Sequence, residues 1–154
     1  MDEALEKIVD YSWLVFTSPT GVQIFKDYLK KHLIDNRKLS HLKFAVIGQG
    51  TAEKMREWGF SPDLMPEVYD SRHLAEELAL QVGKKEKILR PRARMGGREL
   101  TGILESAGIQ TADIPLYDAC YESQPFVDLE KEFGEGISDY AVFTSASTVR
   151  GLVH

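Results

Sequence analysis

The sequence predicts an α/β fold built on a five-stranded, parallel, doubly wound sheet, a flavodoxin-like lobe with helices on both faces. Short apolar runs alternate with amphipathic helical patterns through residue 117, and this alternation is typical of βαβ units. The apolar runs are continuous, as in WLVF at 13–16, which indicates strands that are buried on both faces. The length of 154 residues is sufficient for such a fold to enclose a substantial core.

Two βα units are expected at the start of the chain. The strand at 13–16 is broken by TSPTG at 17–21, after which apolar residues recur at helical spacing, at Val22, Phe25, Leu29 and Leu33. The second strand spans 43–47 and leads through the turn GQGT at 48–51 to a helix at 52–58, which Gly59 closes.

Three further strands complete the predicted sheet. A short strand at 63–66 precedes a helix at 71–82 that carries Leu74, Leu78 and Val82 on one face. The strand at 87–89 leads through an arginine-rich loop to a helix at 97–107, ended by Gly108. The fifth strand spans 109–117, and Pro115 places it at a sheet edge or near its own end.

The pattern changes after residue 117, and a second lobe is expected to begin there. Residues 118–136 are interpreted as a connection with one helix at 125–133. The run AVFTS at 141–145 then restates LVFTS at 14–18, which is an internal repeat. We therefore expect a complete lobe at 1–117 and an incomplete start of a second lobe at 137–154, as in a domain taken from a longer polypeptide.

Composition and charge exclude several classes of protein. Hydrophobic residues make up 43% and charged residues 28%, as in ordinary globular proteins. No apolar run approaches the 18 or so residues of a membrane span, and the acidic residues within 1–10 are unlike a signal peptide. The single cysteine, Cys120, cannot form an internal disulfide. Together with the missing span and signal pattern, this leads us to expect a cytoplasmic protein with no membrane partner. The net charge of −5 argues against nucleic acid as a partner.

One segment reverses the overall charge. Residues 84–98 carry a net +6, whereas the remainder of the chain carries −11. Within it, Arg90, Arg92 and Arg94 follow the strand at 87–89, where a buried strand emerges into a loop, and α/β folds commonly bind ligands at such ends. We therefore predict that Arg92 and Arg94 contact a ligand. The alternative is a solvated turn with no binding role.

Nucleotide, metal and thiol chemistry find little support. The turn GQG at 48–50 lacks the third glycine of a dinucleotide fingerprint and has Glu53 in its place, whose charge would oppose a pyrophosphate. The four histidines have no paired spacing, so no metal site is predicted. Cys120 has no histidine partner in the sequence, and an inert thiol is the favoured interpretation.

Five stretches, in order, resemble the uroporphyrinogen-III synthases: WLVFTSPTGV, FAVIGQGTAEKMREWGF, LAEELA, ILRPRARMGGRELTGILESAGIQTADIPLYDACYE and DYAVFTSASTV. The resemblance implies a lyase of tetrapyrrole biosynthesis, the source of heme, siroheme and cobalamin, that cyclises a linear tetrapyrrole and inverts its last ring without a cofactor. It implies two lobes, with 11–117 matching the inserted lobe, 118–124 the return connection and 137–154 the start of the split lobe. We expect the chain alone to lack turnover and to need the remainder of the second lobe as its partner.

The resemblance also implies site residues. Tyr117 matches a tyrosine proposed to assist departure of the substrate hydroxyl, and its alternative role is to plug a strand end. The positions that match the cleft lining are Ser18, Pro19, Gly48, Thr51 and Arg98, with Ser145 and Ser147 on the opposite lobe. One departure is Ala93, where many relatives have glycine, which predicts a different turn or a weaker ligand contact.

The substrate implied by the resemblance carries eight carboxylates, and the predicted turns suit a polyanion. Helix starts after 18–21, 48–51 and 145–148 offer unpaired N–H groups and a partial positive charge. The alternative for their Ser and Thr residues is N-capping alone.

A flavodoxin-like flavin- or anion-binding module shares the predicted sheet, and TSPTG partly fits its phosphate loop. A receiver domain is disfavoured because Thr17 and Ser18 stand where acidic residues are required, and a periplasmic-type binding lobe because a signal is lacking.

Overall fold

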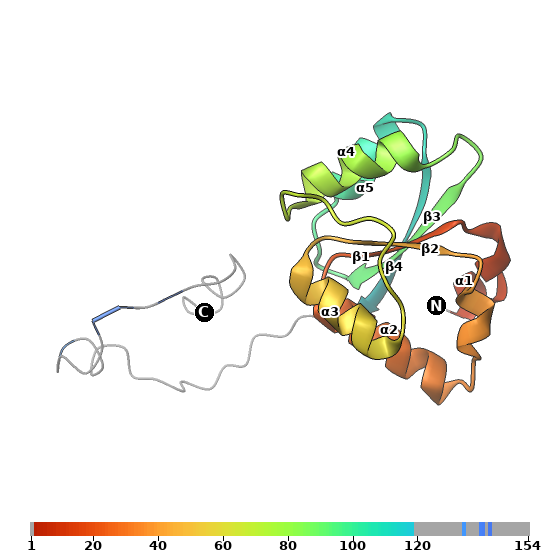
Figure 1. Cartoon of the computed structure of the whole chain (residues 1–154), viewed down its shortest axis with the longest axis horizontal. Coiled ribbons are helices and arrows are strands. Elements are labelled where there is room, and N and C mark those ends of the chain that lie inside the picture. The colour runs from red at the N-terminus through yellow and green to blue at the C-terminus, as the bar shows by residue number, and fades with distance from the viewer. Residues whose placement is uncertain (1, 119–133, 135–138, 141, 143–154) are drawn as a thin grey trace. The chain divides into compact units, whose positions relative to one another are not determined.

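The computed structural model describes residues 2–118, 134, 139–140 and 142 (Figure 1). The chain divides into two units, 1–119 and 120–154, and the account below concerns the first. The linker helix expected at 125–133 lies outside the described residues. So does the strand expected at 141–145, except for Val142, and so does Cys120.

The described part of the chain contains one parallel sheet of four strands, which confirms the predicted α/β class. The strands are β1 (Trp13–Phe16), β2 (Lys43–Val46), β3 (Lys87–Ala93) and β4 (Gln110–Tyr117), and their order in the sheet is β2-β1-β3-β4. β1, at the centre, is buried along its whole length. Its continuous apolar run is therefore explained by packing on both faces.

Of the five predicted strands, the one at 63–66 is reduced to a single bridge, between Leu64 and Ala45 of β2. Two features stop the ladder from extending. The Asp63 carboxylate accepts the N–H of Phe44 at 2.7 Å, and Pro66 has no N–H to donate. The bridge still places this segment beside β2, at the edge of the sheet. Counted as the third strand along the chain, it gives the order 3-2-1-4-5, which is a doubly wound order and differs from the 2-1-3-4-5 of flavodoxin.

Helices cover both faces of the sheet (Figure 1). One face packs Leu14, Phe16 and their neighbours against α2 (Pro19–Lys31) and α3 (Gln49–Trp58). The other packs Trp13 and Val15 against α4 (Ser71–Gln81) and α5 (Glu99–Ser106). The short helix α1 (Asp2–Glu6) and the 3-10 turns at Ile8–Asp10 and Asn36–Leu39 add buried side chains to the first of these cores.

The chain changes face between β1 and β3. After β1 and β2 it returns through α2 and α3 on one face, and after Leu64 and β3 it returns through α4 and α5 on the other. The neighbouring strands β1 and β3 are therefore followed by helices that diverge to opposite faces. In open α/β sheets such a switch point leaves a crevice at the carboxyl ends of the strands, where ligands bind.

Two element ends illustrate how local sequence sets the boundaries. Gly59 has a φ of 99° and closes α3 in the left-handed conformation, as predicted. The prediction for Leu33 was wrong: α2 ends at Lys31, and Leu33 has a φ of 52° and is 93% exposed. The core contact expected of Leu33 is absent because the Ile34 N–H turns back to bond the Leu29 carbonyl at 2.9 Å.

Substitution Gly59→Ala should destabilise the protein by about 1–2 kcal/mol, because an added Cβ penalises the left-handed backbone and no neighbouring atom lies within 4 Å to add a clash. The matched control is Gly102→Ala, which also meets no atom within 4 Å but lies inside α5 with ordinary helical φ, and should be neutral or stabilising. Urea unfolding of both variants measures the difference. Equal stabilities would contradict the assignment of Gly59 to a backbone role.

Candidate functional site

The carboxyl ends of β1 and β4 are joined by two predicted site residues. Ser18 Oγ and Tyr117 Oη lie 3.0 Å apart, although the residues are separated by 99 positions and their strands by β3. Ser18 is also the N-cap of α2, where its Oγ accepts the N–H of Gly21 at 2.9 Å. The bond between these side chains therefore crosses the end of β3, at the switch point.

The turn after β2 lies beside the turn after β1. The Ile47 N–H donates to the Phe16 carbonyl at 3.1 Å, and a Cβ on Gly50 would lie 3.7 Å from the Pro19 ring. Gly48 caps α3 with its backbone alone, since it has no side chain to occupy the N–H groups of the first turn. The first turns of α2 and α3 thus lie side by side, with Pro19 exposed and Gly48 buried.

Tyr69 was not predicted to belong to this region. A Cβ on Gly48 would lie 2.9 Å from the Tyr69 ring, so the ring packs directly against the glycine backbone. Tyr69 is 56% exposed, and its ring borders the start of α3. The sequence gives only a weak signal for this contact, because Tyr69 and Gly48 are 21 positions apart. The path of the chain from Leu64 to α4 brings them together.

The arginine-rich segment does not form a loop directly after residue 89. β3 continues to Ala93, paired with β4 as far as Tyr117, so Arg90 and Arg92 lie within the strand and only Arg94 follows it. The strand continues because β4 is long enough to pair with it, whereas the pairing of β1 with β3 ends at Leu89. The loop comprises residues 94–98 and leads into α5.

Two arginines of this loop are exposed, and one of them, Arg94, lies beside Tyr117. The Arg94 N–H donates to the Tyr117 carbonyl at 2.8 Å, and Arg94 Nε donates to the exposed carboxylate of Asp118 at 2.9 Å. Arg98 is exposed at the N-cap of α5 and makes no side-chain cap hydrogen bond. The backbone therefore holds the start of the loop against the end of β4, next to the Ser18–Tyr117 pair.

Three of the predicted residues are not open to a ligand. Gly48 is buried against the Tyr69 ring. Thr51 is 3% exposed, so its side chain is not available in this structure. The Arg92 side chain is 14% exposed and bonds groups of the protein itself, described below. Burial lowers the pKa of the neighbouring Arg90, and the carboxylate of Asp113 opposes that shift. The predicted Ser145 and Ser147 lie outside the described residues.

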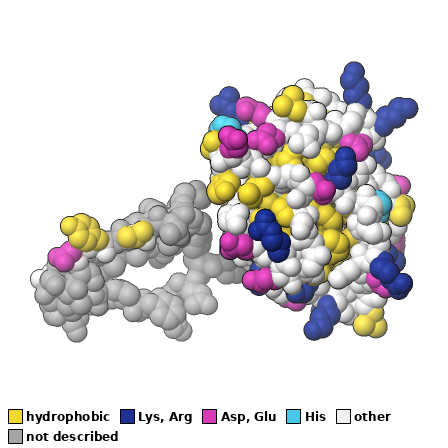
Figure 2. Space-filling model, viewed as in Figure 1, with side chains coloured by type: hydrophobic (Ala, Val, Ile, Leu, Met, Phe, Trp, Pro, Cys, Tyr) yellow, Lys and Arg dark blue, Asp and Glu magenta, His cyan; other side chains and the backbone are white. Residues whose placement is uncertain are grey.

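The electrostatics of this edge come from backbone as well as side chains. The starts of α2, α3 and α5 all lie at the carboxyl ends of the strands, and each leaves N–H groups and a partial positive charge. Figure 2 shows side chains of both signs interspersed over the face it presents, so charge of one sign does not cover that face.

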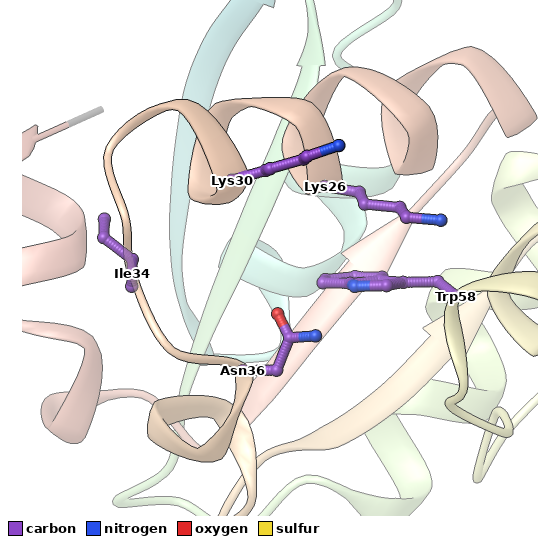
Figure 3. Close-up of a pocket in the computed structure, with 5 residues that line it drawn as sticks. All are labelled: Lys26, Lys30, Ile34, Asn36 and Trp58. Atoms are coloured by element: carbon purple, nitrogen blue, oxygen red, sulfur yellow. The ribbon is translucent and has the colours of Figure 1, made fainter.

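A separate groove lies at the far end of α3. It is lined by Lys26 and Lys30 of α2, Ile34, Asn36 and Trp58 (Figure 3). Trp58 is the last residue of α3 and Gly48 precedes its first, so about ten residues at about 1.5 Å each separate the groove from the predicted site. This groove is not part of the strand-end site.

Two features are absent from residues 2–118, 134, 139–140 and 142. No helix in that part of the chain is long and apolar enough to cross a bilayer. No three histidine, cysteine or acidic side chains gather there as a metal site would require.

Comparisons with known proteins point to one family. The sequence model of the family described as uroporphyrinogen-III synthase HemD matches residues 1–154. A porphyrin biosynthesis protein HemD from Ruminiclostridium josui is 38% identical over 150 residues, which cover 97% of this chain and 30% of that protein. A uroporphyrinogen-III synthase from Synechococcus elongatus is 29% identical over 155 residues, covering 99% of this chain and 57% of that protein.

Solved structures show the same fold. The crystal structure of a mutant uroporphyrinogen III synthase from the extremely thermophilic bacterium Thermus thermophilus matches with a TM-score of 0.68 at 16% identity, covering 98% of this chain and 59% of that one. The wild-type protein from the same organism matches with a TM-score of 0.64 at 17% identity, covering 98% of this chain and 59% of that one. The chain spans less than two thirds of the length of each of these relatives.

A double-mutant cycle should show that Ser18 and Tyr117 are coupled. Ser18→Ala removes both the cap of α2 and the bond to Tyr117 and should cost about 1–2 kcal/mol of unfolding free energy. Tyr117→Phe removes only the second bond and should cost about 0.5–1.5 kcal/mol. Chemical denaturation of the two single variants and the double variant should give a coupling of about 0.5–1 kcal/mol. Strict additivity would contradict the bond.

Proposed function

The chain belongs to the uroporphyrinogen-III synthase family, and on this premise we propose that it contributes to cyclising hydroxymethylbilane, a linear tetrapyrrole, with inversion of the last ring to uroporphyrinogen III. One observation carries the assignment of the site: Tyr117, the residue predicted to assist the reaction, bonds Ser18 at the switch point of the sheet. The start of α2 and the loop at 94–98 border the same point.

Binding of the substrate would rest on donors spread over three strand ends. Eight carboxylates need many hydrogen bonds, and a site that removed all of them from water would be costly. Helix starts at Ser18, Gly48 and Arg98 supply N–H groups at an open edge, where the carboxylates keep part of their hydration. The exposed guanidinium groups of Arg94 and Arg98 add charge where the backbone donors end.

Ser18 orients the phenol of Tyr117 in this proposal. Because Ser18 Oγ accepts the Gly21 N–H, its own hydrogen is available to the Tyr117 oxygen. With Ser18 as donor, the Tyr117 hydrogen is directed to a ligand. A neutral phenol can then donate to the departing hydroxyl without placing a charge beside an electron-rich pyrrole.

The reaction needs orientation more than acid or base strength. The C–O bond of the terminal hydroxymethyl group breaks and the hydroxyl leaves. The same pyrrole loses its N–H proton to the departing hydroxyl, so water is released and the pyrrole becomes an azafulvene. The substituted carbon of the last pyrrole attacks this group to give a spiro intermediate, which rearranges to the inverted macrocycle. Since the pyrroles supply both nucleophile and driving force, the protein acts by holding the chain curled and delaying direct cyclisation.

The proposal extends beyond the described residues. Ser145 and Ser147 would contact the substrate from the opposite lobe, and the remainder of that lobe would be the partner of residues 1–117. Turnover by residues 1–154 alone is predicted to be absent, which a cyclisation assay on this chain and on a longer polypeptide would decide. We place the protein in the cytoplasm, in tetrapyrrole biosynthesis.

A flavin-binding module is the second candidate, because the sheet is parallel and Ser18 caps the helix after β1, where a flavodoxin places its phosphate loop. The visible absorption spectrum of the purified protein separates the two. Flavin absorption that survives dialysis would favour this alternative.

Tyr117→Phe, in a polypeptide with both lobes, should lower the rate of uroporphyrinogen III formation about tenfold or more and raise the share of the non-inverted isomer, because one hydrogen bond to the leaving group is lost. Tyr11→Phe is the matched control, since Tyr11 precedes β1 at the opposite end of the strand. Chromatographic separation of the oxidised isomers measures both quantities. An unchanged rate and isomer ratio would remove the proposed role of Tyr117.

Arg94→Ala should raise the KM for hydroxymethylbilane several-fold and make it less dependent on ionic strength, because an exposed cation beside the site is lost. Arg56→Ala removes an exposed arginine from the far end of α3 and should leave KM unchanged. Steady-state kinetics at low and high salt test the pair. Equal behaviour of the two variants would return Arg94 to a solvated-turn role.

A further inference from the structure

Four side chains form a buried polar cluster between β3, β4 and α5. Arg92 Nε donates to Asp113 at 2.8 Å, and Thr101 Oγ1 donates to the other oxygen of the same carboxylate at 2.9 Å. Arg90 Nη1 donates to Thr101 Oγ1 at 2.8 Å and lies 3.5 Å from Asp113. Asp113 therefore bridges both arginines and ties β4 to α5.

The two guanidinium groups also hold the loop at 94–98 by its carbonyl groups. Arg92 Nη1 donates to the carbonyls of Ala93, Arg94 and Gly96, at 3.0, 3.2 and 2.9 Å. Arg90 Nη2 donates to the carbonyl of Gly97 at 3.2 Å. Four carbonyls from five consecutive residues are thus bonded to two largely buried cations.

Gly96 is required by this arrangement. A Cβ at Gly96 would lie 3.0 Å from the Ala93 carbonyl oxygen and 3.3 Å from Arg92 Nη1, and both atoms are already fixed by hydrogen bonds. At the neighbouring Gly97 a Cβ would meet nothing within 4 Å. The loop therefore packs closely against Arg92 at one residue and is open at the next.

Stability alone does not account for the cluster. Arg90 is 3% exposed, its Nε has no hydrogen-bond partner within the described residues, and burial lowers its pKa. Two cations share one carboxylate, so a positive charge stays uncompensated within the cluster. Buried ionic groups of this kind are often no more stabilising than an apolar core of similar volume. What the guanidinium groups add is a fixed direction for four peptide carbonyls.

We propose that Arg90, Arg92 and Asp113 are positioning residues, which set the ligand-facing surface of loop 94–98 by turning its carbonyls inward. This rests on the proposed function and assigns Arg92 an indirect role in place of the contact predicted from the sequence. The ligand is a polycarboxylate, and outward-facing carbonyl oxygens would repel it. With those oxygens bonded to the guanidinium groups, the loop presents the start of α5 and the side chains of Arg94 and Arg98.

Arg92→Lys tests the proposal, because lysine keeps the charge but cannot hold three carbonyls and Asp113 together. In the polypeptide with both lobes, hydrogen exchange at amides 94–98 should accelerate at least tenfold, while amides of β1 and β2 are unchanged. The KM for hydroxymethylbilane should rise at least fivefold, with kcat within twofold of the parent. Unchanged loop exchange would overturn the positioning role, and a retained KM with faster loop exchange would overturn its link to the ligand.

Gly96→Ala provides a second variant that keeps every charged group, and it decides the matter if Arg92→Lys fails to fold. It should reproduce the faster loop exchange and the higher KM, whereas Gly102→Ala, with open space on α5, should change neither. Gly96→Ala indistinguishable from Gly102→Ala would contradict the proposal. If the parent polypeptide does not cyclise the substrate, the proposed function fails, and the exchange data still decide whether the cluster fixes the loop.

Discussion

The divergence of the chain after β1 and β3 is the constraint on which the site depends. These neighbouring strands carry apolar residues into both cores, and their following helices, α2 and α5, pack on opposite sides of the sheet. The turns after both strands must therefore separate, and in open α/β sheets ligands bind at such a point. The Ser18–Tyr117 hydrogen bond joins the outer strand β4 to the start of α2.

In the proposed function, anion recognition at this edge comes mainly from the backbone. Ser18 makes two of its contacts with one atom: its Oγ accepts the Gly21 N–H and also contacts the Tyr117 hydroxyl. In the same proposal, Arg90 and Arg92 also favour the approach of an acid, because they bond loop carbonyl oxygens that would otherwise repel it. Few exposed cations are then needed, which agrees with a chain whose net charge is −5.

Local sequence predicted the parts of the fold that local interactions determine. The apolar run at Trp13–Phe16 and the glycine at 59 were sufficient for β1 and for the end of α3. The extent of β3 was missed because arginines at 90 and 92 are typical of solvent-facing positions, and only Asp113 and Thr101, more than ten positions away, make their burial possible. The site followed the same division: Ser18 and Tyr117 were predicted, whereas Tyr69 and Asp113 depend on contacts between distant segments. The predicted strand at 63–66 is limited by a local feature, Pro66, and by a distant one, the hydrogen bond of Asp63 to Phe44.

The central claim is that a polycarboxylate tetrapyrrole binds at the carboxyl ends of β1, β2 and β3. Nitrogen–proton correlation spectra of the labelled polypeptide, titrated with the octacarboxylate uroporphyrin III, test this most directly. The account predicts the largest shifts at the amides of 18–21, 48–51 and 94–98. Shifts confined to the groove at Lys26 and Trp58, or a titration that leaves the strand-end amides unmoved, would contradict it.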